Sequence, residues 1–257
     1  MTVDLEGFEA SLYTTSYSQN TIRIYVRRMA HYVSSGEPTF SAWVSNAHRA
    51  GAKAQVVSSM LAAAKAYCNY ACLDDQRREL NKYKAPKPAP PSPHPLPNGI
   101  DDLYKMLEAS SGFVRLAVGL GGFAGTRVSE TRSLDEHSID NNYLIIRGKG
   151  DKTRRVPINE PLANLIEEEY EGIGPMVPYG DSWLRKRISQ SAIDAGVLHR
   201  DGSVPSSHDL RATFATGVFN RTKDIWLVSQ LLGHGDVKQT QTYLGIDSAA
   251  LELAVAV

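Results

Sequence analysis

Cysteine is scarce in this 257-residue chain, which has only Cys68 and Cys72. Their spacing places the two thiols one turn apart on an expected helix, whereas a structural metal site of the zinc type needs four ligands. The pair is therefore interpreted as small core residues. A metal or redox site at the two sulfurs is the alternative.

Long apolar runs are also missing. The most apolar segment, residues 113–124, is interrupted by Arg115 and by glycines, and it is too short to span a bilayer. The chain also lacks a secretory start, in which basic, apolar and small residues follow one another. Both absences predict a soluble protein of the cell interior.

The chain has no excess charge, with 28 Lys or Arg, 28 Asp or Glu, a formal net charge of +0 and a pI near 7.1. A nucleic-acid-binding protein usually has an excess of basic residues. The average conceals an asymmetry, because residues 1–98 carry 11 basic and 7 acidic residues and the remainder carries 17 and 21. Contact with DNA must therefore depend on local patches.

Two kinds of catalytic apparatus are absent from the sequence. It has no GxxxxGK[ST] loop for nucleotide phosphates, and no set of carboxylates that would converge on divalent ions. We therefore expect chemistry that needs no ATP, metal or other cofactor.

Proline is concentrated between Lys84 and Asn98, in KAPKPAPPSPHPLPN, which holds seven of the 13 prolines. Proline neither continues a helix nor pairs within a sheet, so this stretch predicts a semi-rigid linker between domains at residues 1–83 and 99–257. Lys84 and Lys87 are then available to phosphates. A disordered spacer is the alternative.

The segment before the linker has a helical pattern. Ser18 or Asn20 can cap a helix with apolar residues at helical spacing, and Arg23 and Arg27 share another side of it. Its apolar positions are Ile22, Tyr25, Val26, Met29 and Val33. Further helices are expected at residues 41–50 and 53–71. The segment is thus a small helical bundle whose arginines are either DNA contacts or solvated surface residues.

The segment after the linker is helical except for one hairpin. Two β-favouring runs, residues 143–147 and 154–158, are joined by a glycine-containing turn. Helices are expected at residues 100–110, 112–124, 160–170, 181–195, 207–219, 223–232 and 236–243, with a short one after Arg127. The predicted fold class is mainly α with a small antiparallel β-sheet (α+β), in two domains.

Candidate catalytic side chains lie in two further motifs. In SHDLRATFATG, His208 and Arg211 are three residues apart, which puts both on one helix face where they can hold a phosphate. In LLGHGDVKQTQTY, His234 occupies a glycine-flanked turn and Tyr243 follows nine residues later. Taken singly, each residue is more typical of a surface, core or helix-ending position.

Five motifs occur in an order that identifies a family: GTRVSE, GKGDKTRRVPI, HDLRATFAT, LLGH, and the tyrosine nine residues after that histidine. With them the chain resembles the tyrosine recombinases, particularly the phage-type integrases, over its whole length. The resemblance implies a helical, SAM-like core-binding domain at residues 1–83 and a catalytic domain with a C-terminal tail helix at residues 99–257. It also implies an enzyme of the bacterial cytoplasm, associated with the nucleoid.

The same resemblance assigns roles to the candidate residues. Tyr243 attacks a DNA phosphorus and forms a 3′-phosphotyrosyl link, which leaves a free 5′-hydroxyl. Arg127 and Arg211 hold the phosphorane with their guanidinium groups. Lys149, at the hairpin tip, protonates the departing 5′-oxygen, unless Lys152 does so.

The other implied roles support these. His208 accepts or relays a proton near the tyrosine, His234 hydrogen-bonds a nonbridging oxygen, and Glu130 orients the cations. Further DNA contacts are expected at Arg23, Arg27, Lys84, Lys87, Lys152 and Arg154.

Two departures from the family pattern bear on partners. Ala212 stands where many members have a second histidine. No arm-binding domain is expected before the bundle, so the resemblance implies recognition of core-type attachment sites alone. The apolar tail at residues 245–257 packs on its own domain or docks into a neighbour and joins a tetramer around a Holliday junction.

The expected function is the integration and excision of a phage or mobile element, with a directionality factor as a further partner and no membrane contact. The alternatives are a Xer-like resolvase of replicon dimers and a DNA-binding regulator that has lost catalysis.

Overall fold

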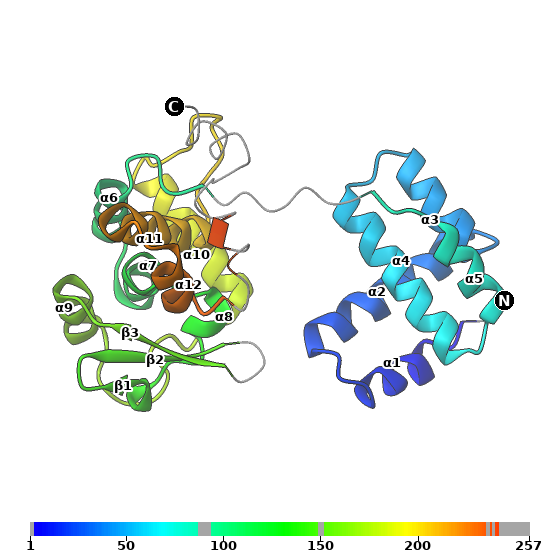
Figure 1. Ribbon diagram of the computed structural model, residues 1–257, viewed down its shortest axis with the longest axis horizontal. Helices are drawn as coiled ribbons and strands as arrows, with labels where there is room; N and C mark the ends of the chain where they lie inside the picture. The colour runs from blue at the N-terminus through cyan, green and yellow to red at the C-terminus, as the bar shows by residue number, and fades with distance from the viewer. Residues whose placement is uncertain (1–2, 87–93, 149–151, 235–236, 238–239, 242–257) are drawn as a thin grey trace. The chain divides into compact units, whose positions relative to one another are not determined.

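The chain forms two compact units, Met1–Pro90 and Pro91–Val257, each with a hydrophobic core of its own (Figure 1). This computed structural model describes residues 3–86, 94–148, 152–234, 237 and 240–241. The division falls inside the proline-rich segment.

The first unit is a bundle of helices. They are α1 (Leu5–Tyr13), α2 (Gln19–Ser35), α3 (Phe40–Arg49), α4 (Ala54–Tyr70) and α5 (Asp74–Lys82). Helices α2 and α4 pack along each other, and the buried Ala63 and Ala64 let α4 approach closely. Ser18, rather than Asn20, caps α2, because its hydroxyl accepts a hydrogen bond from the Thr21 amide at 3.3 Å.

Some expectations for this unit need correction. Cys72 is exposed and lies beyond the end of α4 with a left-handed φ of 54°, so only Cys68 is a core residue. Val33 is 52% exposed, because α2 turns another side inward. The buried residues of α2 are Ile22, Met29 and Tyr32. Helices α1 and α5 extend the bundle beyond the expected elements.

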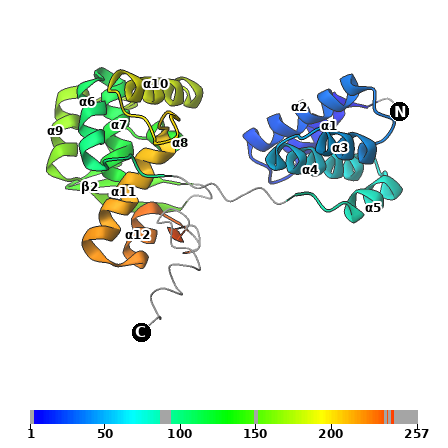
Figure 2. The same ribbon diagram turned by 90° about the horizontal axis from the view of Figure 1, so that it is seen from above.

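The second unit is mainly helical with a small antiparallel sheet, which confirms the expected α+β class. Its helices are α6 (Ile100–Glu108), α7 (Gly112–Ala124), α8 (Val128–Thr131), α9 (Glu160–Glu169), α10 (Asp181–Asp194), α11 (Ser207–Thr222) and α12 (Ile225–Leu232), with a 3-10 helix η1 at Glu136–Ser138. Helix α7 contacts α6, α9, α10 and α11 and so forms the centre of the unit (Figure 2). None of the helices in the described parts of the chain is long and apolar enough to cross a membrane.

The sheet has the order β1-β2-β3, with β1 at Ile139–Asp140, β2 at Tyr143–Arg147 and β3 at Thr153–Pro157. Ile146 on β2 pairs with Arg154 on β3, and Leu144 pairs with Val156. All four of these residues are buried, because alternate residues of a strand face the same side. An arginine therefore occupies an inward position of β3.

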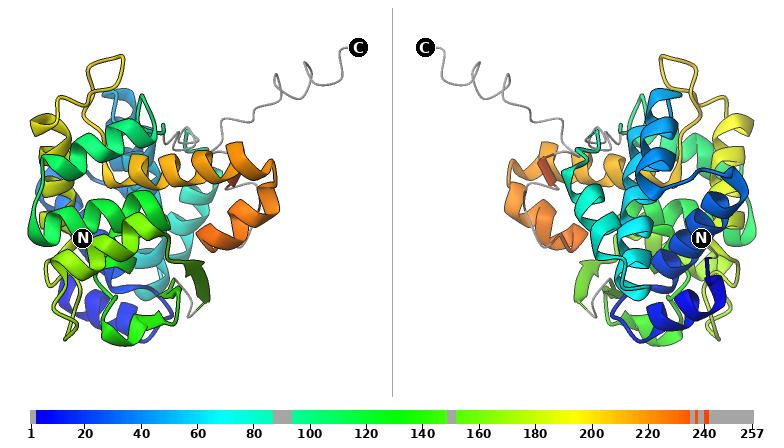
Figure 3. Two further views of the ribbon diagram at one scale, coloured as in Figure 1. Left: turned by 90° about the vertical axis from the view of Figure 1, so that its left-hand side faces the viewer. Right: turned by 90° about the vertical axis from the view of Figure 1, so that its right-hand side faces the viewer.

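Helices α11 and α12 lie against each other at one margin of the second unit (Figure 3). Helix α11 continues past the expected end to Thr222, and Lys223, with a φ of 54°, terminates it. Helix α12 consequently begins at Ile225. Of the helix expected at residues 236–243, only Val237, Thr240 and Gln241 are described, and these are helical.

Candidate active site

Arg127 is the N-cap residue of the short helix α8 and follows directly after a tight turn. Helix α7 ends at Ala124 and is capped by Gly125, whose φ of 62° is left-handed, and a Cβ on Gly125 would meet a Phe214 ring carbon at 2.5 Å. The Arg127 amide donates a hydrogen bond to Oε2 of Glu130 at 2.8 Å, and its guanidinium donates to Oε1 at 2.7 Å. The Arg127 side chain remains 33% exposed. The turn and the carboxylate together fix a cation at the surface.

Glu130 is the centre of a buried ion-pair network. Arg154 donates hydrogen bonds to both carboxylate oxygens, at 3.0 and 2.8 Å, and the Arg154 and Glu130 side chains are 7% and 4% exposed. Burial alone would raise the pKa of Glu130, but the hydrogen bonds and charge of Arg154, with the Arg127 amide and the charge of Arg211, lower it to about 2. Glu130 is therefore an anion at neutral pH, and its chemistry is to hold cations.

Arg211 on α11 is fully buried, with 0% exposure. Its Nη1 donates to the Gly125 carbonyl at 2.5 Å and lies 3.5 Å from Oε2 of Glu130. Its Nη2 donates to the Leu232 carbonyl at 2.6 Å and to Nε2 of His234 at 3.1 Å. One guanidinium thus ties together the end of α7, the helix α8 and the end of α12.

His234 follows the left-handed Gly233 that ends α12. Arginine only donates hydrogen bonds, so Nε2 of His234 accepts the bond from Arg211 and the proton of the neutral ring lies on Nδ1. Nδ1 therefore donates a hydrogen bond to the Thr240 hydroxyl, at 2.8 Å. Burial first, and then the charge of Arg211, lowers the pKa of His234 to about 3. The ring is therefore neutral at physiological pH.

His208 lies in the first turn of α11, beside a helix cap. The Ser206 hydroxyl accepts a hydrogen bond from the His208 amide at 3.2 Å and donates one to Asp209 at 2.8 Å. The ring of His208 is exposed, and its Nε2 is 3.5 Å from Nη1 of Arg185 on α10. Although the ring reaches the surface, surrounding protein displaces enough water to lower the pKa of His208, and the charge of Arg185 lowers it further against the opposing charge of Asp209.

The structure brings Arg127, Glu130, Arg211 and His234 into one hydrogen-bonded network. His208 contacts Arg185 and lies one helical turn before Arg211. Three further expected residues, Lys87, Lys149 and Tyr243, lie outside the described residues. In the described part of the chain, no three His, Cys, Asp or Glu side chains lie close enough together to hold a metal ion.

Arg154 does not lie where a DNA contact was expected. Its guanidinium turns into the protein and pairs with Glu130, because position 154 shares the inward face of β3 with Val156. Lys152 is exposed and lies directly before the same strand. The other described candidates for DNA contact, Arg23, Arg27 and Lys84, are exposed residues of the first unit.

Sequence reasoning missed Arg185 and Thr240. The expected helix at residues 236–243 could have indicated Thr240, because it lies six residues after His234, within reach of a turn and a short helix. No local pattern indicates Arg185, since only the packing of α10 on α11 brings it to His208. The alternation of β3 was sufficient to place Arg154 inward.

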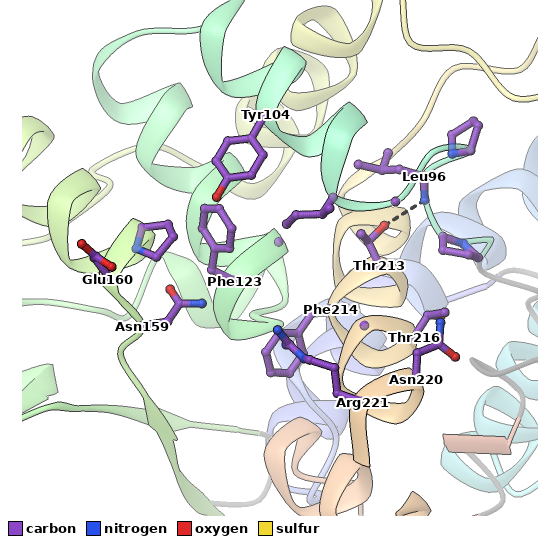
Figure 4. A pocket seen from close by; sticks show the side chains of 17 residues that line it. Leu96, Tyr104, Phe123, Asn159, Glu160, Thr213, Phe214, Thr216, Asn220 and Arg221 are labelled. Atoms are coloured by element: carbon purple, nitrogen blue, oxygen red, sulfur yellow. Dashed lines mark hydrogen bonds between the residues drawn. The ribbon is translucent and has the colours of Figure 1, made fainter. Parts of the chain in front are cut away.

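A separate cavity of about 770 Å³ lies beside the end of the proline-rich segment, α6, α7 and α11 (Figure 4). The Thr213 hydroxyl anchors its wall by accepting a hydrogen bond from the buried Leu96 amide at 2.8 Å. Tyr104, Phe123 and Phe214 give it an aromatic lining. The residues of the network do not line it, so the cavity and the network are different sites.

Comparison with known proteins gives a family match and several similar structures. Residues 97–249 match the model of the phage integrase family. Tyrosine recombinase XerA of Pyrococcus furiosus is 27% identical to the chain, over 98% of this chain and 92% of the relative.

Two crystal structures of lambda integrase share the fold. A dimer bound to a COC′ core site superposes with a TM-score of 0.74 at 18% identity, covering 93% of each chain. A tetramer bound to a Holliday junction has a TM-score of 0.72 at 18% identity, covering 90% of this chain and 76% of the other. At these identities the likeness concerns the fold alone.

Proposed function

Since the chain belongs to the phage integrase family of tyrosine recombinases, we propose that it cleaves and rejoins duplex DNA at specific sites through a 3′-phosphotyrosyl intermediate. One observation carries this proposal. The Glu130 carboxylate fixes Arg127 and Arg154 by hydrogen bonds and lies 3.5 Å from Arg211, which in turn contacts the neutral His234. The guanidinium groups of Arg127 and Arg211, held around this carboxylate, are suited to the negative charge of a pentavalent phosphorus.

The proposed reaction has two reversible steps. The Tyr243 oxygen attacks the phosphorus, the bond to the 5′-oxygen breaks, and the departing oxygen takes a proton from Lys149 or Lys152. The 5′-hydroxyl of another strand then attacks the phosphotyrosine and releases the enzyme. His208 accepts the tyrosine proton, for which it must be neutral, and the lowered pKa of His208 favours that state.

The two arginines of the sequence motifs, Arg127 and Arg211, differ in what they present to a phosphate. Arg127 is 33% exposed and can contact DNA as it stands. Arg211 is buried, and its terminal nitrogens donate to the Gly125 and Leu232 carbonyls and to His234. We infer that DNA binding moves the turn at Leu232 and His234, so that Arg211 and the histidine exchange these contacts for phosphate oxygens.

The first unit is proposed to be a core-binding domain. Its exposed Arg23 and Arg27 lie one turn apart on α2, where they can follow a DNA backbone. Lys84, which is exposed, and Lys87, which lies outside the described residues, are proposed as further phosphate contacts from the proline-rich segment. The proposed partner is therefore duplex DNA with core-type attachment sites, which agrees with the core site in the lambda integrase dimer.

Four copies are proposed to act together on two DNA sites. The tail at residues 245–257 ends in AALELAVAV, and the aromatic cavity with Arg221 at its wall suits this apolar stretch, in which Glu252 is the one acidic side chain. We place the tail of a neighbouring copy there. Sedimentation of the protein on a synthetic Holliday junction should show a tetramer, and a chain ending at Gly245 that still sediments as a tetramer would refute the tail contact.

Integration or excision of a phage or mobile element, with a directionality factor, is the proposed biological role. Resolution of replicon dimers is the second candidate, because XerA of Pyrococcus furiosus matches nearly the full length of the chain. Recombination assays separate the two. An integrase joins two different attachment sites, whereas a dimer resolvase recombines two copies of one site.

The chemistry is tested by trapping covalent adducts on nicked core-site DNA. Wild-type protein should form a protein–DNA adduct, and Tyr243→Phe should form none because it lacks the attacking hydroxyl. An adduct with Tyr243→Phe would overturn the proposed nucleophile. Specific binding without any adduct from the wild type would instead support a DNA-binding regulator.

A further inference from the structure

Arg154 lies where three segments of the active site meet. It belongs to β3, the strand that follows the hairpin tip bearing Lys149 and Lys152. Its two terminal nitrogens donate to the two oxygens of Glu130, at 3.0 and 2.8 Å, and Glu130 in turn holds Arg127. The hairpin is thus attached to the arginine-bearing turn by a pair of hydrogen bonds between charged groups.

Arg154 also touches the turn that carries His234. A Cβ placed on Gly233 would lie 3.0 Å from Cδ of Arg154 and 3.4 Å from its Nη1. Helix α12 packs on β3 at this point. The arginine stem is therefore wedged between the hairpin and the end of α12, and its position is determined from two sides.

The geometry of this contact is specific to arginine. A planar guanidinium donates two parallel hydrogen bonds to one carboxylate, whereas an ammonium donates from a single nitrogen and does not fix the direction of its stem. Both partners are nearly inaccessible to solvent, so water does not replace a lost bond easily. The contact fixes the orientation of the hairpin base and not merely its distance.

We propose that Arg154 is a positioning residue that holds the β2–β3 hairpin on Glu130, so that the hairpin-tip lysine delivers its proton to the departing 5′-oxygen. This inference rests on the proposed recombinase function. In the step concerned, the bond between the Tyr243 oxygen and phosphorus forms, the bond from phosphorus to the 5′-oxygen breaks, and one proton moves from the lysine ammonium to that oxygen. Arg154 touches none of the reacting atoms.

The test compares two DNA substrates that differ in their need for a proton. One has the normal 5′-oxygen at the scissile position, and the other has a sulfur in place of that bridging oxygen. A thiol has a pKa of about 8.5, so the sulfur departs as a thiolate and needs no proton. Arg154→Met should cleave the oxygen substrate about 100-fold more slowly than wild type or worse, the range of general-acid catalysis. It should cleave the sulfur substrate within about 3-fold of the wild-type rate.

Arg154→Lys keeps the charge and is less disruptive to folding, and it should show the same selective loss because its ammonium cannot make the paired contact. Arg155→Met is the matched control. Arg155 is the next residue of β3, its guanidinium pairs with Asp140 at 3.0 Å on the exposed side, and its removal should leave both rates unchanged. Thermal unfolding of each variant shows whether it is folded. If Arg154→Met does not fold, the rates of Arg154→Lys on the two substrates decide the test.

Equal slowing of both substrates would overturn the proposal, because it would mean that Arg154 supports Arg127 or the fold as a whole. The proposal would also be overturned if Arg154→Lys cleaved the oxygen substrate at the wild-type rate. If the wild-type protein forms no tyrosine-linked adduct with either substrate, the proposed function fails and this inference fails with it. If the wild type forms the adduct but the Arg154 variants slow both substrates equally, this inference is refuted and the proposed function stands.

Discussion

A buried carboxylate such as Glu130 is unfavourable unless neighbouring groups compensate its charge. Here hydrogen bonds from Arg154 and from the side chain and amide of Arg127 supply that compensation. A buried ion pair is often no more stable than a well-packed apolar pair, so stability alone does not explain its presence. Its value at this place is that it fixes the directions of guanidinium groups around one point.

Glu130→Gln should destabilise the second unit by about 3 kcal/mol, because it leaves the buried Arg154 without a counter-charge. Native-state hydrogen exchange of peptides from α7 and α11 measures the loss. The control is Glu168→Gln, which removes an ion pair to Arg115 from a glutamate that is 54% exposed. That change should cost no more than about 0.5 kcal/mol. Equal losses in the two variants would contradict the central role of Glu130.

His208 allows a prediction about pH. Partial burial and the charge of Arg185 lower the pKa of His208, with Arg211 and Arg127 acting in the same direction and Asp209 opposing them. Arg185→Met removes a positive charge whose Nη1 lies 3.5 Å from Nε2 of His208, and it should therefore raise this pKa. Histidine NMR titration measures the pKa directly.

The sign of the catalytic effect follows from the proposed role of His208 as proton acceptor. A higher pKa leaves more of the ring protonated at a given pH, so the acidic limb of the cleavage rate should move to higher pH in Arg185→Met. Arg187→Met is the control, because Arg187 lies on the same helix with its guanidinium over the Trp183 ring at 5.3 Å. A fall in the pKa of His208, or no change, would refute the electrostatic coupling to Arg185.

At the scale of elements, helix α11 carries both His208 and Arg211, and its start is fixed by a reciprocal cap. The Ser206 amide donates to Asp209 at 2.6 Å, and the Ser206 hydroxyl accepts from the His208 amide. The residue proposed to accept the tyrosine proton is thus positioned by the cap itself.

Ser206→Ala should cost about 1 kcal/mol of stability, since it removes the hydroxyl that caps the helix. The loss should appear as faster hydrogen exchange in the first turn of α11 and as a fall in the melting temperature of a few degrees. Ser203→Ala is the control, because the Ser203 hydroxyl bonds Asp201 in the preceding loop at 2.6 Å and caps no helix. If the first turn of α11 exchanges no faster in Ser206→Ala than in Ser203→Ala, the cap does not hold it.

The elements that the sequence predicted well are those with a regular hydrophobic period. Helix α7 and the hairpin strands follow from apolar spacing and from turn residues, and the expected α+β class is confirmed. The structure brings Arg127, Glu130 and Arg211 together, and the catalytic roles expected for them stay predictions. No local pattern indicated Arg185, because its contact with His208 depends on how two helices pack. The alternation of β3 places Arg154 inward, but nothing in the sequence of the short helix α8 indicated that Glu130 would be its partner.

At the scale of the whole molecule, zero net charge conceals an uneven distribution. Residues 1–90 carry 11 basic and 7 acidic residues, so the first unit is positive and the second is negative. Each contact with a DNA phosphate releases counterions. The salt dependence of binding therefore reflects the number of phosphate contacts and not the net charge of the protein. A neutral protein that binds DNA through a basic surface on one unit should therefore still be strongly sensitive to salt.

We expect the affinity for a core site to fall steeply with salt, by about 1,000-fold or more between 50 and 200 mM if at least six phosphates are contacted. Replacing Arg23 and Arg27 together by alanine should reduce the slope of log affinity against log salt by about two, one for each lost phosphate contact. The loss should be equal on core-site and random DNA, because phosphate contacts carry no sequence information. Arg78→Ala, on a residue that pairs with Asp75 on α5, is the control and should leave the slope unchanged. Fluorescence anisotropy over a salt series gives the slopes of the wild type and of both variants. If the double variant has the wild-type slope, Arg23 and Arg27 on α2 do not contact DNA phosphates.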